Sequence, residues 1–195
     1  MSAFRRSDDG VIRALFTSQE SHVLINLTEQ LLELLGEGAS QISHESDPFL
    51  HLVGFGANEL PPDDPVLRRL LPDAYDDPEA SAEFRRYTEH GLREKKRAHA
   101  LTIYEALLPQ DEEWNADNPI ERGSIEIEIK EVETMDWLSG INDLRLALAV
   151  RLGIEKSDGS TQQRYELMKE SDPMKAVYAV YNWLGSIQQS LIEAQ

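Results

Sequence analysis

The densest group of chemically active side chains in this sequence is a basic cluster at residues 85–97. Six of these thirteen residues are basic and two are acidic, which leaves a local charge of +4. The cations that we consider candidates for binding a partner are Arg85, Arg86, Arg93, Lys96 and Arg97. On one interpretation they form a strip that binds an acidic partner or nucleic acid. On the other they pair within the protein, because Glu89 precedes Arg93 by four residues, the favourable orientation for a helical ion pair.

A second polar set lies on an apolar helix predicted at residues 137–153. Apolar residues recur there at spacings typical of a helix with one buried face: Trp137, Ile141, Leu144, Leu148 and Leu152. The polar residues beside this stripe are Asn142, Asp143, Arg145 and Arg151. A buried polar group without a partner costs about 1–3 kcal/mol. These four residues therefore form either a ligand or partner site, or a buried network that fixes helix packing.

Motifs diagnostic of catalysis or metal binding are absent from the sequence. The five histidines include no HExxH motif and no pair separated by three or four residues. His44 and His51 would align with Asp47 only on a helix, which the proline between them disfavours. No GxGxxG, GxxxxGK[ST] or GxSxG motif occurs either. The sequence therefore predicts no catalytic, cofactor-binding or metal-binding residue.

The composition restricts the classes of function further. The chain has 36 acidic and 19 basic residues, a net charge of −17, and no cysteine. A field of this sign repels a phosphate backbone, so direct nucleic-acid binding is disfavoured unless a local basic patch overrides it. Without cysteine the chain has no disulfide, thiolate metal site or thiol switch. No apolar run approaches the roughly 20 residues of a membrane span, and residues 1–10 lack the apolar core of a signal peptide. We therefore expect a cytoplasmic protein.

Two segments predict a small antiparallel sheet. An Asp-Gly pair separates short apolar runs at residues 4–6 and 11–15, which favours a hairpin. Isoleucine alternates with charged residues in the segment near 124–130, as in a half-buried strand. We expect this strand to pair with the N-terminal hairpin.

Helical patterns account for most of the remaining sequence. A capping box before residue 20 begins a first helix that ends at Gly36. Asp-Pro pairs predict helix starts at residues 65, 78 and 173. The helix from residue 78 extends to about residue 108, with Gly91 as a candidate break. A central helix runs from about residue 134 to Gly153, and a short helix lies near 163–169.

The expected fold class is α+β, predominantly helical: a helical bundle with a small antiparallel sheet at one edge, in a single domain at residues 1–195. On the long helix we expect the core-facing side chains to be Phe84, Tyr87, Ala98, Leu101, Tyr104, Leu107 and Leu108. The apolar faces of the central and last helices could also form a homodimer.

Three blocks of the sequence are distinctive enough to be compared with known families. They are DDPVLRRLLPDAYDDPEASAEFRRYTE at 63–89, WLSGINDLRLALAVRLG at 137–153 and VYNWLGSIQQSLIEA at 180–194. In this order they resemble the actinobacterial AosR-like family, named after an aerobic oxidative-stress regulator and formerly a domain of unknown function. The resemblance implies a mostly helical cytosolic protein that takes part in transcriptional control of the oxidative-stress response through protein contacts. It brings no catalytic residues.

The chain departs from the resemblance in one respect. A thiol-based redox switch, associated with the regulator that names the family, cannot operate in a chain without cysteine. We expect a non-enzymatic regulatory or adaptor protein with a protein partner, drawn from the transcription machinery. The alternatives are an uncharacterised enzyme with a carboxylate-lined pocket, and direct DNA binding through the basic strip at 85–97. A deep polar cleft with perturbed acids would favour the enzyme.

Overall fold

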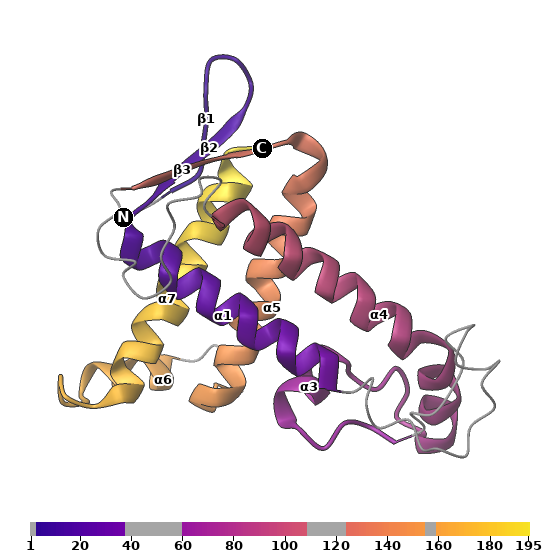
Figure 1. The fold of residues 1–195 in the computed structure, drawn as a ribbon. Helices are drawn as coiled ribbons and strands as arrows, with labels where there is room; N and C mark the ends of the chain where they lie inside the picture. The colour runs from indigo at the N-terminus through magenta and orange to yellow at the C-terminus, as the bar shows by residue number, and fades with distance from the viewer. Residues whose placement is uncertain (1–2, 38–59, 109–123, 155–158) are drawn as a thin grey trace.

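The computed structural model describes residues 3–37, 60–108, 124–154 and 159–195 and consists of packed helices with a three-stranded sheet at one end (Figure 1). In chain order its elements are β1 (Arg5–Arg6), β2 (Ile12–Phe16), α1 (Ser18–Glu37), α3 (Pro65–Leu70), α4 (Pro78–Leu107), β3 (Ile125–Ile129), the 3-10 turn η2 (Glu131–Glu133), α5 (Thr134–Leu152), α6 (Gly159–Glu166) and α7 (Pro173–Glu193). The predicted α+β, mainly helical class is confirmed.

The helix ends follow the local sequence. The side chains of Asp64, Asp77 and Asp172 accept hydrogen bonds from first-turn N–H groups, and a proline follows each aspartate. The capping box predicted before α1 is present. Gly153 ends α5 in the left-handed conformation with φ 66°, which explains the glycine there. These starts and stops are therefore encoded by the residues beside them.

Three boundaries differ from the prediction. α4 continues through Gly91 without a break, because one glycine costs only about 1 kcal/mol in a helix and packing offsets that amount. α1 ends at Glu37 rather than Gly36. The short helix predicted near 163–169 lies earlier, at Gly159–Glu166.

The sheet has the strand order β1-β2-β3, and both pairs are antiparallel. Ala14 lies opposite Ile127, and alternate residues of β2 and β3 are buried, as the alternating pattern predicted. Phe16 at the end of β2 contacts Phe4 and Trp183 edge-on, with ring centroids 5.8 and 6.3 Å apart. The buried face of the sheet thus joins the core of the helices.

α5 is the central helix. It packs against α7, α4 and α3, and to a smaller extent against α1 (Figure 1). At Gly140 the backbone of α4 comes very close, since an added Cβ would lie 3.1 Å from the His99 carbonyl oxygen and 2.6 Å from Ile103 Cδ1. The absence of a side chain at Gly140 therefore sets the approach of α4 to α5.

The buried side of α4 differs from the predicted one. Its buried residues are Ser81, Arg85, Glu89, Arg93, His99, Ala100, Ile103 and Leu107. Leu107 is buried as predicted, and Tyr104 and Leu108 are half-buried, but Ala98, Leu101, Phe84 and Tyr87 are exposed. The prediction was wrong for Phe84 and Tyr87 because it assumed that the charged residues of the first half face solvent. It was also wrong for Ala98 and Leu101, because the second half buries the face that carries His99, Ala100 and Ile103.

Replacement of Gly140 by alanine should destabilise the fold by about 1–3 kcal/mol, because the new methyl group would overlap the Ile103 side chain and crowd the His99 carbonyl oxygen of α4. Gly91, which is exposed and has no atom near its Cβ position, provides the matched control. G91A should leave stability unchanged or raise it by up to about 1 kcal/mol through helix propensity. Urea unfolding of both variants measures the difference, and equal effects would contradict the close helix crossing.

Candidate functional site

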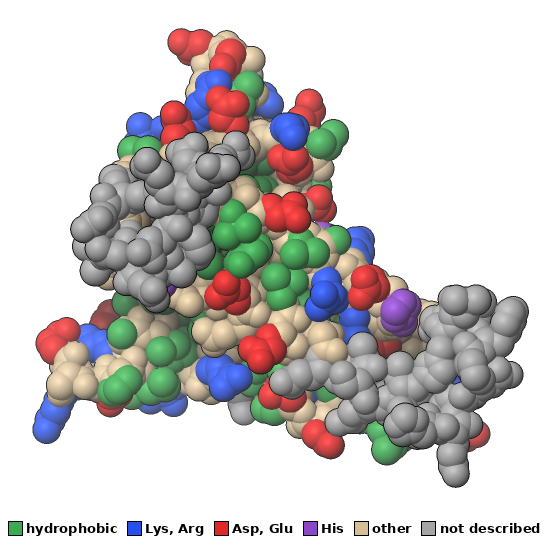
Figure 2. All heavy atoms as spheres, in the orientation of Figure 1, with side chains coloured by type: hydrophobic (Ala, Val, Ile, Leu, Met, Phe, Trp, Pro, Cys, Tyr) green, Lys and Arg blue, Asp and Glu red, His purple; other side chains and the backbone are tan. Residues whose placement is uncertain are grey.

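The five cations predicted to bind a partner do not share one surface. Arg85 and Arg93 are buried, Lys96 and Arg97 are half-buried, and Arg86 is exposed. Figure 2 shows acidic side chains spread over the described part of the face in view, with basic side chains only singly or in small groups. Two of the five therefore present no charge to solvent, and binding of a partner by the other three stays a prediction.

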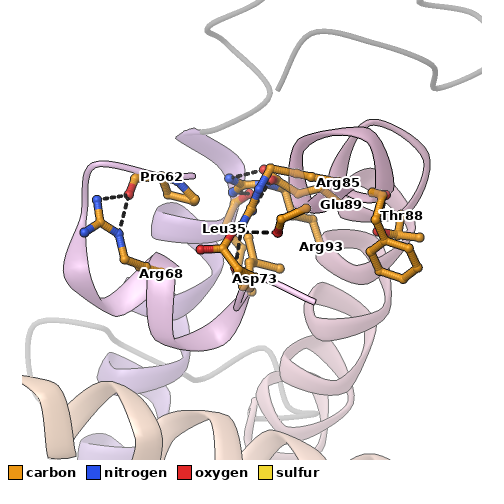
Figure 3. Close-up of polar contacts among 11 residues, drawn as sticks. Leu35, Pro62, Arg68, Asp73, Arg85, Thr88, Glu89 and Arg93 are labelled. Carbon is orange, nitrogen blue, oxygen red and sulfur yellow. Dashed lines mark hydrogen bonds and ion pairs between the residues drawn. The ribbon is translucent and has the colours of Figure 1, made fainter. Parts of the chain in front are cut away.

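The two buried arginines share one carboxylate. Glu89 accepts a hydrogen bond on Oε2 from Arg85 Nη1 at 2.7 Å and on Oε1 from Arg93 Nε at 2.9 Å. Arg85 Nη2 also donates to Asp73 Oδ1 at 2.7 Å and to the Leu71 carbonyl at 3.3 Å. Figure 3 shows these side chains converging between α4 and the segment that follows α3. The buried carboxylate of Glu89 and the exposed carboxylate of Asp73 balance the two cations, which makes the burial of both arginines tolerable.

The arginines of α4 also hold the end of α1. Arg93 Nη1 donates to the Leu35 carbonyl at 3.2 Å, and Arg97 Nη1 donates to the Leu32 carbonyl at 3.1 Å. The last turn of α1 contains no basic residue of its own. Because the C-terminal end of a helix carries partial negative charge and unpaired carbonyls, cations from a neighbouring helix stabilise it. The Glu89–Arg93 ion pair considered from the sequence is present, and the structure adds Arg85 as a second partner of Glu89, which the sequence analysis did not include.

A pocket lies beside this ion network. It is a shallow depression between α4 and the segment after α3, open to solvent, with a cavity volume of about 20 Å³, room for about one water molecule. Its lining combines apolar side chains with the outer atoms of the network: Leu71, Pro72, Ala74, Ser81, Phe84, Arg85, Thr88, Glu89 and Leu92. All of these residues except Leu92 lie within the first of the three sequence blocks, residues 63–89.

Exposed apolar side chains surround the pocket. Phe84 and Leu92 line it and are 41% and 40% exposed. Tyr75 is 53% exposed and contacts Phe84 edge-on, with ring centroids 5.7 Å apart. Aromatic side chains grouped on a surface are typical of sites where proteins bind one another.

A second polar contact joins α4 to α5. Lys96 Nζ lies 2.7 Å from Asp143 Oδ1, and His99 Nε2 lies 3.6 Å from Asp136 Oδ1. Burial lowers the pKa of His99, and the carboxylates of Asp136 and Asp143 oppose that effect only in part. The neutral imidazole is therefore the form that the folded protein favours.

The four polar residues beside the stripe of α5 lie in different environments. Asp143 is buried against Lys96, whereas Asn142 and Arg151 are exposed. Arg145 is half-buried and donates to Gln188 on α7, with its guanidinium carbon 5.3 Å from the centroid of the Tyr181 ring. The structure does not bring these four residues together; two of them connect α5 to different helices, and a binding role for the set stays a prediction.

The charged side chains at the pocket are hydrogen-bonded to one another. Both oxygens of Glu89 accept hydrogen bonds from arginine. The Arg85 guanidinium holds the pKa of Asp73 below its usual value, and Ser81 Oγ donates to the same carboxylate at 3.1 Å. Within the described ranges there is no group of three or more His, Asp or Glu residues placed to hold a metal ion. These hydrogen bonds connect α4 to the segment after α3, and they occupy the carboxylates of Glu89 and Asp73, which would otherwise be candidates for an acid or base.

Sequence reasoning missed part of this site. It did not select Asp73, and it assigned Phe84 to the core and did not consider Leu92. The signal that it passed over is the recurrence of small and charged residues every four positions, at 81, 85, 89 and 93. That spacing marks one helical face as clearly as an apolar stripe does.

Comparisons with known proteins give a consistent result. A family model described as a domain of unknown function, DUF2017, matches residues 1–195. The oxidative stress regulators AosR of Mycobacterium tuberculosis and Mycobacterium bovis are each 29% identical over 195 residues, covering 92% of this chain and 80% of their own length. A Mycobacterium leprae relative, also named for AosR, is 30% identical over 197 residues, covering 93% of this chain and 81% of its own. No solved structure matches this chain.

Replacement of Glu89 by glutamine should destabilise the fold by about 3–5 kcal/mol, because it leaves two buried guanidinium groups without their shared counter-charge. Glu94 on the same helix is exposed and lies 3.7 Å from Arg97, so E94Q is the matched control and should change stability by no more than about 0.5 kcal/mol. Chemical denaturation of both variants tests the contrast. If E89Q were as stable as E94Q, the network would not hold α4 in place.

The lowered pKa of His99 predicts a dependence of stability on pH. The unfolded chain binds a proton near pH 6.5 and the folded chain only at lower pH, so the stability from the neutral imidazole is present above pH 6.5 and is lost as pH falls through the folded pKa. H99Q should therefore lose less free energy of unfolding than the unmodified protein between pH 7.5 and pH 5.5. The exposed His90 serves as the control position through H90Q. Equal pH dependence in all three proteins would refute this assignment.

Proposed function

The chain belongs to the DUF2017 family, and from that membership we propose that it is a non-enzymatic regulatory or adaptor protein that acts in transcriptional control of a stress response through protein–protein contacts. The observation that carries the proposal is the similarity, over more than nine-tenths of this chain, to mycobacterial proteins named oxidative stress regulators. Those names describe the relatives and motivate the same role here.

The geometry of the site supports binding in preference to catalysis. The pocket is bordered by exposed aromatic and aliphatic side chains, while its charged groups are already paired with one another. An enzyme that uses a carboxylate as acid or base needs one that is within reach of substrate and free to exchange a proton. Glu89 and Asp73, the carboxylates in contact with Arg85, are instead occupied by hydrogen bonds.

Direct DNA binding through residues 85–97 receives less support. Arg85 and Arg93 point inward and are compensated by Glu89, and Lys96 is paired with Asp143. The net charge of −17 adds a repulsive field around any phosphate backbone. A protein partner from the transcription machinery therefore fits the chain better than DNA itself.

The absence of cysteine shapes the proposed role. The chain has no thiol that a peroxide could oxidise to a disulfide. We propose that the chain does not sense peroxide through a thiol of its own and that it acts in the cytoplasm together with its partner. Within the described residues no helix is long and apolar enough to cross a bilayer.

Affinity purification of the tagged chain from its own host, with and without peroxide and read by mass spectrometry, tests the proposal. We expect reproducible enrichment of RNA polymerase or a sigma factor over an untagged culture. An unrelated acidic protein of similar charge, carrying the same tag, controls for non-specific capture. The absence of any reproducible partner in both conditions would count against a regulatory adaptor.

A further inference from the structure

We propose that the outer side of α4 binds α4 of a second copy of this chain, with the two helices antiparallel. The sequence suggested a homodimer through the central and last helices, but in the structure those helices, α5 and α7, pack against one another. Three features of α4 support a contact there instead: a seven-residue repeat of exposed positions, the complementary sizes of the side chains at these positions, and the balance of charge on the helix. The inference is independent of the proposed function.

The outer side of α4 carries large apolar side chains that stay exposed. α4 packs against α1 and α5 through its inner side (Figure 1). On the outer side Phe84, Tyr87 and Leu101 are exposed. Between them, nothing lies within 4 Å of the position that a Cβ atom would take at Gly91, so the middle of this side is open. Because a helix normally buries residues of these types, their exposure indicates a surface that another helix covers.

The exposed positions follow the seven-residue repeat of a coiled coil. Steps of four and three residues alternate without a break from residue 80 to residue 105, over about 38 Å of helix. Positions at this spacing form one seam along a helix. All members of the seam are exposed except the first, which is half-buried: Ala80, Phe84, Tyr87, Gly91, Glu94, Ala98, Leu101 and Glu105. The sequence analysis assigned four of these residues to the core because the seam has the periodicity of a packed helix face.

The side chains of the seam are complementary to those of a second, antiparallel seam. In one register every pair joins two apolar residues of different size or sets a glutamate against one of the smallest residues: Phe84–Leu101, Tyr87–Ala98, Glu94–Gly91 and Glu105–Ala80. The two-fold axis of the dimer forms each pair twice. A parallel pairing would instead set Glu94 against Glu94 and leave a gap between the two Gly91 residues. The seam therefore favours an antiparallel second copy.

The charge of α4 permits this contact although the net charge of the chain is −17. Apart from its buried residues, the helix carries four acids and four bases: Glu79, Glu83, Glu94, Glu105, Arg86, Lys95, Lys96 and Arg97. The neighbouring elements α1 and α3, and the segment after α3, add exposed charges of both signs: Glu29, Glu33, Arg68, Arg69, Asp73, Asp76 and Asp77. Two copies therefore repel one another less across α4 than their net charges alone would imply.

Sedimentation velocity of the purified full chain over a series of concentrations tests the proposal. We expect a species with twice the mass of one chain to increase with concentration and to predominate by about 100 μM. L101D should raise the dissociation constant of the dimer at least about 10-fold, because it sets a carboxylate against Phe84 of the second copy. A98E should weaken the dimer as well, since it adds charge and bulk opposite Tyr87 at a position where glutamate suits a helix.

Leu92 provides the matched control. It lies on the same helix, is 40% exposed against 37% for Leu101, and is not a member of the seam. L92D should therefore dimerise within about twofold of the unmodified chain. Circular dichroism and thermal unfolding show whether each variant is folded, and A98E, a change at an exposed alanine, carries the test if L101D fails to fold.

The orientation of the two helices can be tested with single thiols, because the chain has no cysteine of its own. A80C and E105C place a thiol at opposite ends of the seam. Oxidation of an equimolar mixture of the two variants should give a disulfide-linked dimer, and oxidation of either variant alone should give much less, because only antiparallel copies bring residue 80 beside residue 105.

Three results would overturn the proposal: a monomer at every concentration, equal dimerisation by the unmodified chain, L101D and A98E, or cross-linking of A80C with itself as efficient as with E105C. A monomer would mean that the outer side of α4 is covered by something other than a second copy. None of these results bears on the proposed regulatory role, because the affinity purification from the host tests that role without reference to α4.

Discussion

Glu89 lies between two arginines on the buried side of α4, and the packing around the first half of that helix depends on this arrangement. A guanidinium group cannot be buried without a counter-charge and satisfied hydrogen bonds. Glu89 supplies the charge for Arg85 and Arg93, and Asp73 together with the carbonyls of Leu71 and Leu35 supplies the remaining acceptors. The network thereby ties α4 to the segment that precedes it and to the end of α1, which lies 58 residues away in the chain at the Arg93–Leu35 contact.

The two halves of α4 pack by different physical means. In the first half the contacts are hydrogen bonds between charged groups, which require specific directions. In the second half Ala100, Ile103 and Leu107 are fully buried, and α4 approaches α5 at Gly140. The directional bonds fix how α4 is rotated about its axis, and the apolar contacts contribute most of the stabilising burial. Lys96, paired with Asp143, lies at the transition between the two halves.

The burial of charge has a consequence for the surface. Because Arg85, Glu89 and Arg93 occupy the inward face of the first half of α4, Phe84 and Leu92 remain partly exposed around a pocket. A helix normally places these residue types the other way round. The proposed role in protein binding rests on these exposed apolar side chains and on the pairing of the neighbouring charged groups. Mycobacterial proteins that are similar to this chain are named oxidative stress regulators.

The sequence alone determined the fold class and the helix starts at the three Asp-Pro pairs, because each depends on neighbouring residues or on a short repeat. It also predicted that the strand near 124–130 pairs with the N-terminal hairpin, and three of its blocks indicated the family. It also indicated that Glu89 could pair with Arg93. Only the tertiary structure decided which face of α4 is buried. Charged residues every four positions can face either water or a buried counter-charge, and the choice depended on Asp73 and on carbonyls of α1 that lie far away in the sequence. The pocket arose in the same way, since its two walls come from segments whose contact no local pattern encodes.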